Sequence, residues 1–253
     1  MIAALPMYQR AENAAAHAVL WALIRDGLRV RGIEAPEALD VETDHMEVWG
    51  RPDLVLSQIC NLPYRAVYRE RVTLIGASDY GLKDCAPGYY YSYFVVPKDD
   101  PASRPEEAAG YPLDHNDGLS QSGWGAAQLW AAERGFAFPA GKATGAHSAS
   151  LARLAEGRGR LAAIDAVTWR NLERWAPEQV AAVKIIGRTG ASPGQSFITR
   201  AGEDPAPYSA AIAEAIGALP AEEAATLGLK GIVPLPASAY DLPLPPKPEA
   251  SAA

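Results

Sequence analysis

The sequence has only two cysteines, Cys60 and Cys85, among its 253 residues. Their spacing fits no zinc-binding pattern, because no C-x2-4-C pair is present. We expect a disulfide between them, since Cys60 precedes a turn and Cys85 lies in a loop rich in glycine and proline. Two separate thiols are the alternative. A disulfide would indicate an oxidising compartment.

Long apolar runs are also absent. The longest are far shorter than the roughly 20 residues that a membrane-spanning helix needs. Residues 1–8 lack the basic start and the long apolar stretch of a secretory signal, and polar Gln9 and Arg10 follow at once. We therefore expect either a cytoplasmic protein or a numbering that begins after an export signal.

Basic residues are outnumbered by acidic ones. The chain has 23 Lys and Arg against 30 Asp and Glu, a formal net charge of -7. This balance argues against nucleic acid or an anionic membrane as the main partner, but a small anion at a helix N-terminus remains compatible with it. No Walker pattern, G-x-S-x-G motif or cluster of metal ligands is present. We accordingly predict no catalytic residue, no metal and no cofactor.

The pattern that is present alternates strands and helices. Apolar and amphipathic segments in the first 80 residues follow the order strand, helix, strand, helix, strand, which is typical of an α/β fold with a mostly parallel sheet. A second series of the same kind starts near residue 112, and residues 141–145 within it are expected to be a loop. Residues 89–96 and 187–196 are candidate connections between two lobes. The Pro/Ala-rich tail from Leu242 is expected to be disordered.

Within the second series, a polar turn precedes a helix at residues 116–124, Asn-Asp-Gly-Leu-Ser-Gln-Ser-Gly-Trp. Ser120 is suited to cap this helix through its hydroxyl. The N–H groups at a helix start have no intrahelical partner and carry a partial positive charge. They can bind a small oxyanion without lysine or arginine. Taken alone, the segment is better explained by a capped helix without a ligand, because most capped helices bind nothing.

Several segments, in order along the chain, resemble the phosphate/phosphonate/phosphite solute-binding proteins of ABC transporters. Residues 116–123 resemble that family's N-D-P-x-S-x-S-G stretch, with Gly118 in place of Pro and Gln121 in place of the Thr that several members have. Residues 5–8 resemble its first strand and loop, residues 87–92 its Tyr-Ser crossover, residues 145–157 its G-x-H-x-x-A…G segment, and residues 161–165 the strand that follows.

The resemblance implies an α/β type II periplasmic-binding-protein fold with two lobes, a ligand cleft between them and two crossover strands. We place lobe 1 at residues 1–93 and 192–253, and lobe 2 at residues 94–191. The resemblance further implies a monomer that captures a small oxyanion of the phosphate, phosphonate or phosphite class. Hinge closure would bury the ligand and present the protein to a membrane permease.

On this reading the serine-rich turn contacts the ligand, through the hydroxyls of Ser120 and Ser122, the amide of Gln121 and the backbone at Gly123. His147, at the start of the next helix, would donate a hydrogen bond to a ligand oxygen. Further contacts from the facing lobe and the hinge are expected from Tyr8, Ser57, Gln58, Tyr90 and Ser92.

Asp165 ends a buried strand, at the sheet edge where α/β proteins place ligand contacts. Its carboxylate would accept a bond only from a protonated ligand oxygen or an amine. Capping of the next helix is an equal alternative. Two other functions also stay open: a chorismate dehydratase-like cytoplasmic enzyme, with a carboxylate substrate on the serine turn and His147 or Asp165 as base, and a cytoplasmic oxyanion sensor.

Overall fold

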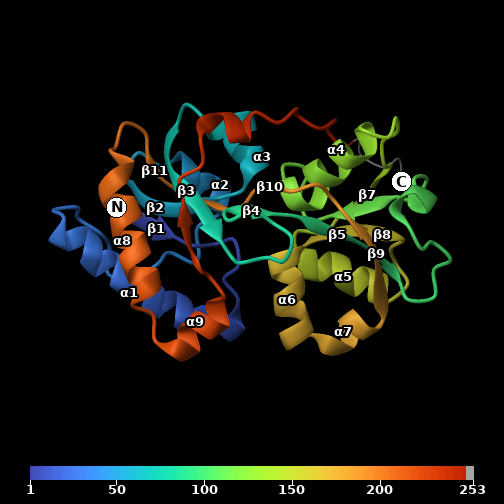
Figure 1. Cartoon of the computed structure of the whole chain (residues 1–253), viewed down its shortest axis with the longest axis horizontal. Coiled ribbons are helices and arrows are strands. Elements are labelled where there is room, and N and C mark those ends of the chain that lie inside the picture. The colour runs from blue at the N-terminus through green and yellow to red at the C-terminus, as the bar shows by residue number, and fades with distance from the viewer. Residues whose placement is uncertain (249–253) are drawn as a thin grey trace. The chain divides into compact units, whose positions relative to one another are not determined.

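The computed structural model describes residues 1–248, and Figure 1 traces their helices and strands. The chain forms two compact units: unit 1 is Met1–Tyr89 with Pro193–Asp241, and unit 2 is Tyr90–Ser192 with the residues from Leu242. The first two passages between the units are the strands β4 (Tyr89–Tyr90) and β10 (Ser192–Pro193), which pair with each other. The predicted two-lobed α/β fold with two crossover strands is confirmed. No helix within residues 1–248 has both the length and the apolarity that crossing a membrane requires.

Unit 1 is built on a five-stranded sheet. In spatial order its strands are β1 (Ile2–Ala4), β2 (Leu54–Ile59), β11 (Ser196–Arg200), β3 (Val72–Asp79) and β12 (Gly231–Val233). β1 is parallel to β2, whereas β11 is antiparallel to both β2 and β3. The sheet is therefore mixed and not mostly parallel as predicted, because β11, formed after the chain returns from unit 2, separates β2 from β3.

Helices cover the sheet of unit 1. α1 (Ala14–Val30) packs on both α8 (Pro205–Gly217) and α9 (Ala221–Leu227) (Figure 1). An aromatic cluster includes Trp49 of α2 (His45–Gly50), Tyr68 of the π-helical turn Tyr64–Tyr68 that follows α3 (Asn61–Pro63), and Tyr240 of the 3-10 turn Ala237–Tyr240. The first helix buries one apolar face, which includes Leu20, Trp21, Ile24 and Leu28.

Unit 2 contains a second five-stranded sheet, in the order β7 (Ala140–Ala143), β6 (Leu113–His115), β8 (Leu161–Asp165), β5 (Ser92–Pro97) and β9 (Val183–Arg188). β6 is parallel to β7 and β8, while β5 is antiparallel to β8 and β9. The expectation of a loop at residues 141–145 is wrong for the first three of them, which belong to edge strand β7. Gly141 lets this strand approach β6, since a Cβ there would come within 2.7 Å of the Leu113 carbonyl carbon.

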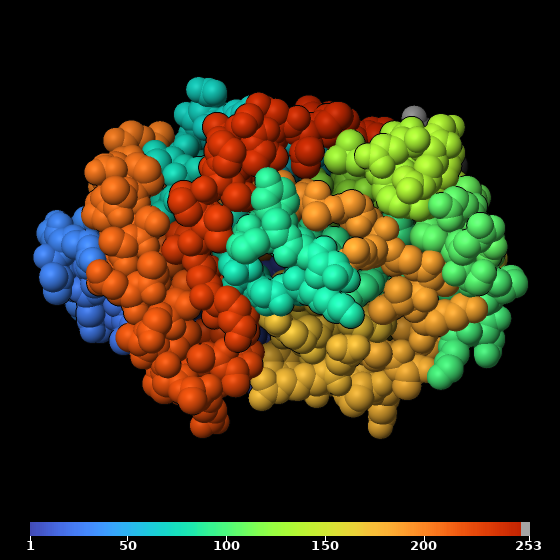
Figure 2. Space-filling view, in the orientation of Figure 1, coloured from blue at the N-terminus to red at the C-terminus, as the bar shows by residue number. Residues whose placement is uncertain are grey.

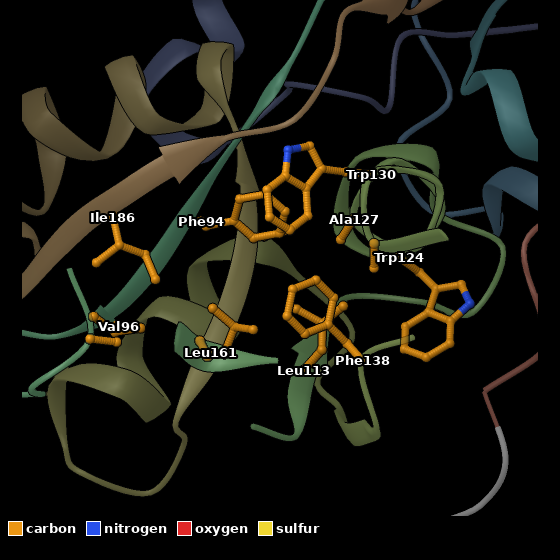
Figure 3. Close-up of a cluster of buried hydrophobic side chains, with 13 residues drawn as sticks. Phe94, Val96, Leu113, Trp124, Ala127, Trp130, Phe138, Leu161 and Ile186 are labelled. Atoms are coloured by element: carbon orange, nitrogen blue, oxygen red, sulfur yellow. The ribbon is translucent and has the colours of Figure 1, made fainter. Parts of the chain in front are cut away.

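The sheet of unit 2 is covered on both faces, and its strands alternate accordingly. Leu161 and Ala163 of β8 face α4 (Ala126–Ala132), while Ala162 and Ile164 face α5 (His147–Ala155) and α6 (Ala166–Trp175), which leads to α7 (Pro177–Ala181). Figure 3 shows the first cluster, in which the ring of Phe94 lies 4.9 Å from that of Trp130. The core thus fixes the strand ends that carry the candidate site.

Two sequence predictions are wrong. Cys60 and Cys85 are thiols in the structure and form no disulfide with each other, because turns at both ends of a segment do not bring two Cα atoms within the roughly 7 Å that a bridge requires. Residues 242–248 are ordered and group with unit 2, although the prediction made them a disordered part of lobe 1. The last predicted tail residues, 249–253, lie outside the described part of the chain.

Candidate ligand-binding site

The serine-rich turn forms the N-terminus of the helix that leads into α4. Ser120 is the N-cap, and its Oγ accepts the Gly123 N–H at 3.1 Å, which confirms the predicted cap. The N–H groups of Trp124 and Gly125 both donate to the Ser120 carbonyl, at 3.2 and 2.9 Å. The first turn, Gln121–Gly125, is therefore a wide π-helical turn, a conformation that occurs often at functional sites.

Glycine is required at position 123 because the turn leaves no space for a side chain there. A Cβ at this position would lie 2.0 Å from Oδ1 of Asn116 and 3.3 Å from the Asn116 backbone nitrogen. Asn116 follows β6 directly, so the strand end and the helix start are in close contact here. The glycine predicted as a backbone contact for the ligand is therefore also what allows the turn to close onto the strand.

His147 begins α5, as predicted, and lies against the serine turn. Its Nε2 is 2.8 Å from Oγ of Ser122 and 3.4 Å from Oδ2 of Asp165. The hydroxyls of Ser120 and Ser122 are 3.4 Å apart, and Oγ of Ser92 donates to the Ser122 carbonyl at 2.9 Å. The structure thus brings together five of the predicted residues from β5, β8, α5 and the serine turn, and none of them is a lysine or an arginine.

Asp165 is almost completely buried and caps α6. Its Oδ1 accepts the N–H groups of Val167 at 3.0 Å and Thr168 at 2.8 Å, and its Oδ2 accepts the Thr168 hydroxyl at 2.5 Å. The capping alternative is therefore confirmed. Because three donors of α6 already occupy this carboxylate, a contact between Asp165 and a ligand remains a prediction.

Burial determines the protonation state of His147. It lowers the pKa of His147 below the ordinary 6.5, and the negative charge of Asp165 and the carbonyl of Ala163 oppose this shift. A neutral imidazole has one N–H to donate. The same nitrogen, Nε2, contacts both Ser122 and Asp165, whereas a catalytic Ser-His-Asp arrangement needs the two partners on different ring nitrogens. The arrangement of these three side chains therefore differs from that of a catalytic triad.

We expect stability to depend on pH through His147. Its pKa is lower in the folded state, so between that pKa and about 6.5 the unfolded chain binds a proton that the folded chain does not. The free energy of unfolding should therefore rise with pH across this window and lose this dependence above it. Urea unfolding between about pH 5 and pH 8 measures the slope.

His147→Gln should reduce this slope, because it removes the group whose pKa burial lowers. His17, which is buried and whose pKa burial also lowers, should supply the slope that remains. An unaltered slope in His147→Gln would contradict the assignment.

Gln121 and Tyr90 lie where the chain connects the two units. Nε2 of Gln121 donates to Oγ of Ser192 in β10 at 3.4 Å, and Tyr90 is buried in β4. Sequence analysis missed Ser192 and also Thr189, whose hydroxyl accepts the Ser92 N–H at 3.0 Å. Both follow from the interpretation of residues 187–196 as a connection, because polar side chains there are placed to bond the neighbouring connecting strand.

The three candidates on unit 1 have partners within that unit. The ring of Tyr8 packs edge-on against Tyr80 at 5.1 Å, and Nε2 of Gln58 donates to Oγ of Ser78 at 3.0 Å. Ser57 is fully buried in β2. Ser78, near the end of β3, was missed, although the rule that selected residues 57–58 at the end of β2 applies to it equally. Ligand contact by the unit 1 residues remains a prediction.

Comparison with known proteins decides the family. Residues 4–240 match the family described as "ABC transporter, phosphonate, periplasmic substrate-binding protein". The chain belongs to this family. The match covers nearly the whole chain, both units included, and confirms the resemblance seen in the sequence motifs. No curated protein sequence matches the chain.

Solved structures similar to this phosphonate-binding family member share its fold at low sequence identity. PhnD1 from Prochlorococcus marinus, in complex with methylphosphonate, is 13% identical with a TM-score of 0.68, over 95% of this chain and 93% of that one. The binding protein component of an ABC phosphonate transporter from Pseudomonas aeruginosa is 16% identical with a TM-score of 0.65, over 95% and 82%. A Xanthomonas citri protein bound to ATP is 15% identical with a TM-score of 0.67, over 94% and 92%.

Proposed function

We propose that this chain binds a small phosphorus oxyanion, a phosphonate in the first place, and presents it to the permease of an ABC transporter. The observation that supports this most directly is the contact of Ser122 Oγ with His147 Nε2 at 2.8 Å, at the N-terminus of a helix. It places two hydroxyls, an imidazole and the first N–H groups of the helix in one small volume. Family membership makes an oxyanion the first ligand to test.

Neutral donors suffice for such a ligand. A hydrogen bond to a charged group contributes about 1.5–3 kcal/mol, so three or four of them sum to about 4.5–12 kcal/mol, a range that includes micromolar binding. The partial positive charge at the helix N-terminus adds to this attraction. The Ser120 hydroxyl accepts the Gly123 N–H through one lone pair, which leaves its O–H as a donor, with the Ser122 hydroxyl 3.4 Å away.

Asp165 supports a preference among oxyanions. Its buried carboxylate lies 3.4 Å from His147 Nε2, so a ligand oxygen held by His147 would be close to a second negative charge. A ligand that carries a proton on that oxygen, or an ammonium group near it, avoids the repulsion. The site is therefore proposed to prefer a monoprotonated phosphonate or an aminoalkylphosphonate over a fully ionised anion.

Thermal-shift and calorimetric titrations test the function directly. Methylphosphonate and aminoethylphosphonate should raise the melting temperature, because they bind the native state alone, and phosphate and phosphite should raise it less. Sulfate, which carries no proton at neutral pH, serves as the matched control. Stabilisation by an aromatic carboxylate and by no phosphorus oxyanion would refute the proposal and favour an enzyme on this fold.

A further inference from the structure

The chain passes between the two units a third time, at residues 241 and 242. We infer that residues 242–248 form a strap of nearly fixed length, which ties the end of unit 1 to the ligand-site turn of unit 2 and limits how far the units separate. In Figure 2 this C-terminal segment, in red, lies on the surface and reaches the yellow-green residues around α4.

The strap is anchored to unit 1 immediately before residue 242. Tyr240 is buried, its hydroxyl is 2.7 Å from Oγ of Ser196, and its ring packs on Tyr64 with centroids 5.3 Å apart. Asp241 forms an ion pair with Arg69. Two side chains, with three partners between them, therefore hold this end of the segment in place.

At its other end the strap is attached to the serine turn. Nε1 of Trp124, a residue of that turn, donates to the Pro246 carbonyl at 2.7 Å. Pro248 packs on Gly118, where a Cβ would meet its Cγ at 2.7 Å and its Cδ at 3.1 Å. Gly118 has no positive φ, so its backbone accepts other residues and the glycine is needed here for room.

The composition between the two anchors leaves little slack. Residues 242–246 read Leu-Pro-Leu-Pro-Pro, and each proline fixes its own φ and restricts the residue before it. Five residues span about 16 Å in the polyproline conformation and at most about 18 Å when fully extended. The two anchors therefore cannot move farther apart than about 18 Å without detaching Tyr240 or Trp124 from its partner.

The strap has a direct consequence for binding. If the units part less in the ligand-free state, fewer open arrangements compete with the one that holds ligand, and the apparent affinity is higher. The effect on affinity rests on the proposed function. The tether itself does not, because it is measurable without any ligand.

Two variants, one substitution and one truncation, test the tether. Gly118→Ala should displace Pro248, and a stop after Asp241 should remove the strap altogether. Gly110→Ala is the matched control, since nothing lies within 4 Å of its Cβ position and its φ is not positive. NMR follows hydrogen exchange of the Trp124 indole N–H, small-angle scattering follows the radius of gyration without ligand, and calorimetry gives the methylphosphonate Kd.

Both variants should speed exchange of the Trp124 indole N–H by about tenfold or more, increase the ligand-free radius of gyration and weaken methylphosphonate binding roughly three- to tenfold. Gly110→Ala should match the parent chain in all three. Unchanged indole exchange in Gly118→Ala, or an unchanged radius of gyration after truncation, would overturn the strap. A parent chain that binds no methylphosphonate would refute the proposed function, and the exchange and scattering data would still decide the strap.

Discussion

Ser122→Ala is expected to weaken methylphosphonate binding roughly ten- to hundredfold while the ligand-free protein keeps nearly its full stability. The Ser122 hydroxyl faces Nε2 of His147 and caps no backbone group, so its loss removes a donor for the ligand and leaves the helix start intact. A hydrogen bond to a charged group is worth about 1.5–3 kcal/mol, which corresponds to this range. Calorimetric titration gives the Kd and urea unfolding the stability.

Ser120→Ala separates the two roles that serine has in this turn. Its Oγ accepts the Gly123 N–H, and loss of such a cap costs about 1 kcal/mol of stability. Ser148→Ala, at a half-buried serine next to His147 in α5, is the control and should change neither quantity. Unchanged affinity in Ser122→Ala would remove the serine turn from the site, whatever Ser120→Ala does.

Gly123→Ala should both destabilise the protein and abolish detectable binding. The added methyl group would lie 2.0 Å from Oδ1 of Asn116, so strand end and helix start must move apart. Overpacking of this kind costs about 1–3 kcal/mol. The same movement displaces Ser122 from His147, and hydrogen bonds are lost steeply with such misplacement. Urea unfolding and calorimetry measure the two effects.

A second substitution shows whether the clash is the cause. Asn116→Ala removes the side chain that the new methyl group meets, and the remaining contact, 3.3 Å to the Asn116 nitrogen, is tight but tolerable. The double variant should therefore be more stable than the sum of the single effects predicts. Strict additivity would mean that the side chain of Asn116 is not what makes Gly123 necessary. Gly110→Ala again serves as a neutral glycine control.

The structure gives a physical reason why residue 118 is glycine here and not the proline of the family motif. In the motif that residues 116–123 resemble, this position is Pro, and here Pro248 packs against the site of the missing Cβ. A side chain at position 118 and the C-terminal segment would compete for the same space. The sequence shows the glycine and the proline-rich tail separately, 130 positions apart, and no local rule connects them.

Features that depend on neighbouring residues could be predicted. The strand at residues 161–165, the start of a helix at His147 and the caps Ser120 and Asp165 follow from apolar patterns and from side chains that bond N–H groups two or three positions on. Family motifs placed the same residues at a ligand site. Sequence alone therefore determined these elements and these caps, and its motifs pointed to the family.

Tertiary structure decided what distant segments do to one another. Three features join parts of the chain that are far apart in sequence. They are the insertion of β11 between β2 and β3, the contact of Ser122 with His147, and the packing of residues 242–248 on Trp124 and Gly118. Such pairings depend on packing and on unsatisfied polar groups of the whole fold, for which no short-range pattern exists. For this reason the sequence could only propose candidate donors, and the fold showed which of these side chains meet and what holds them together.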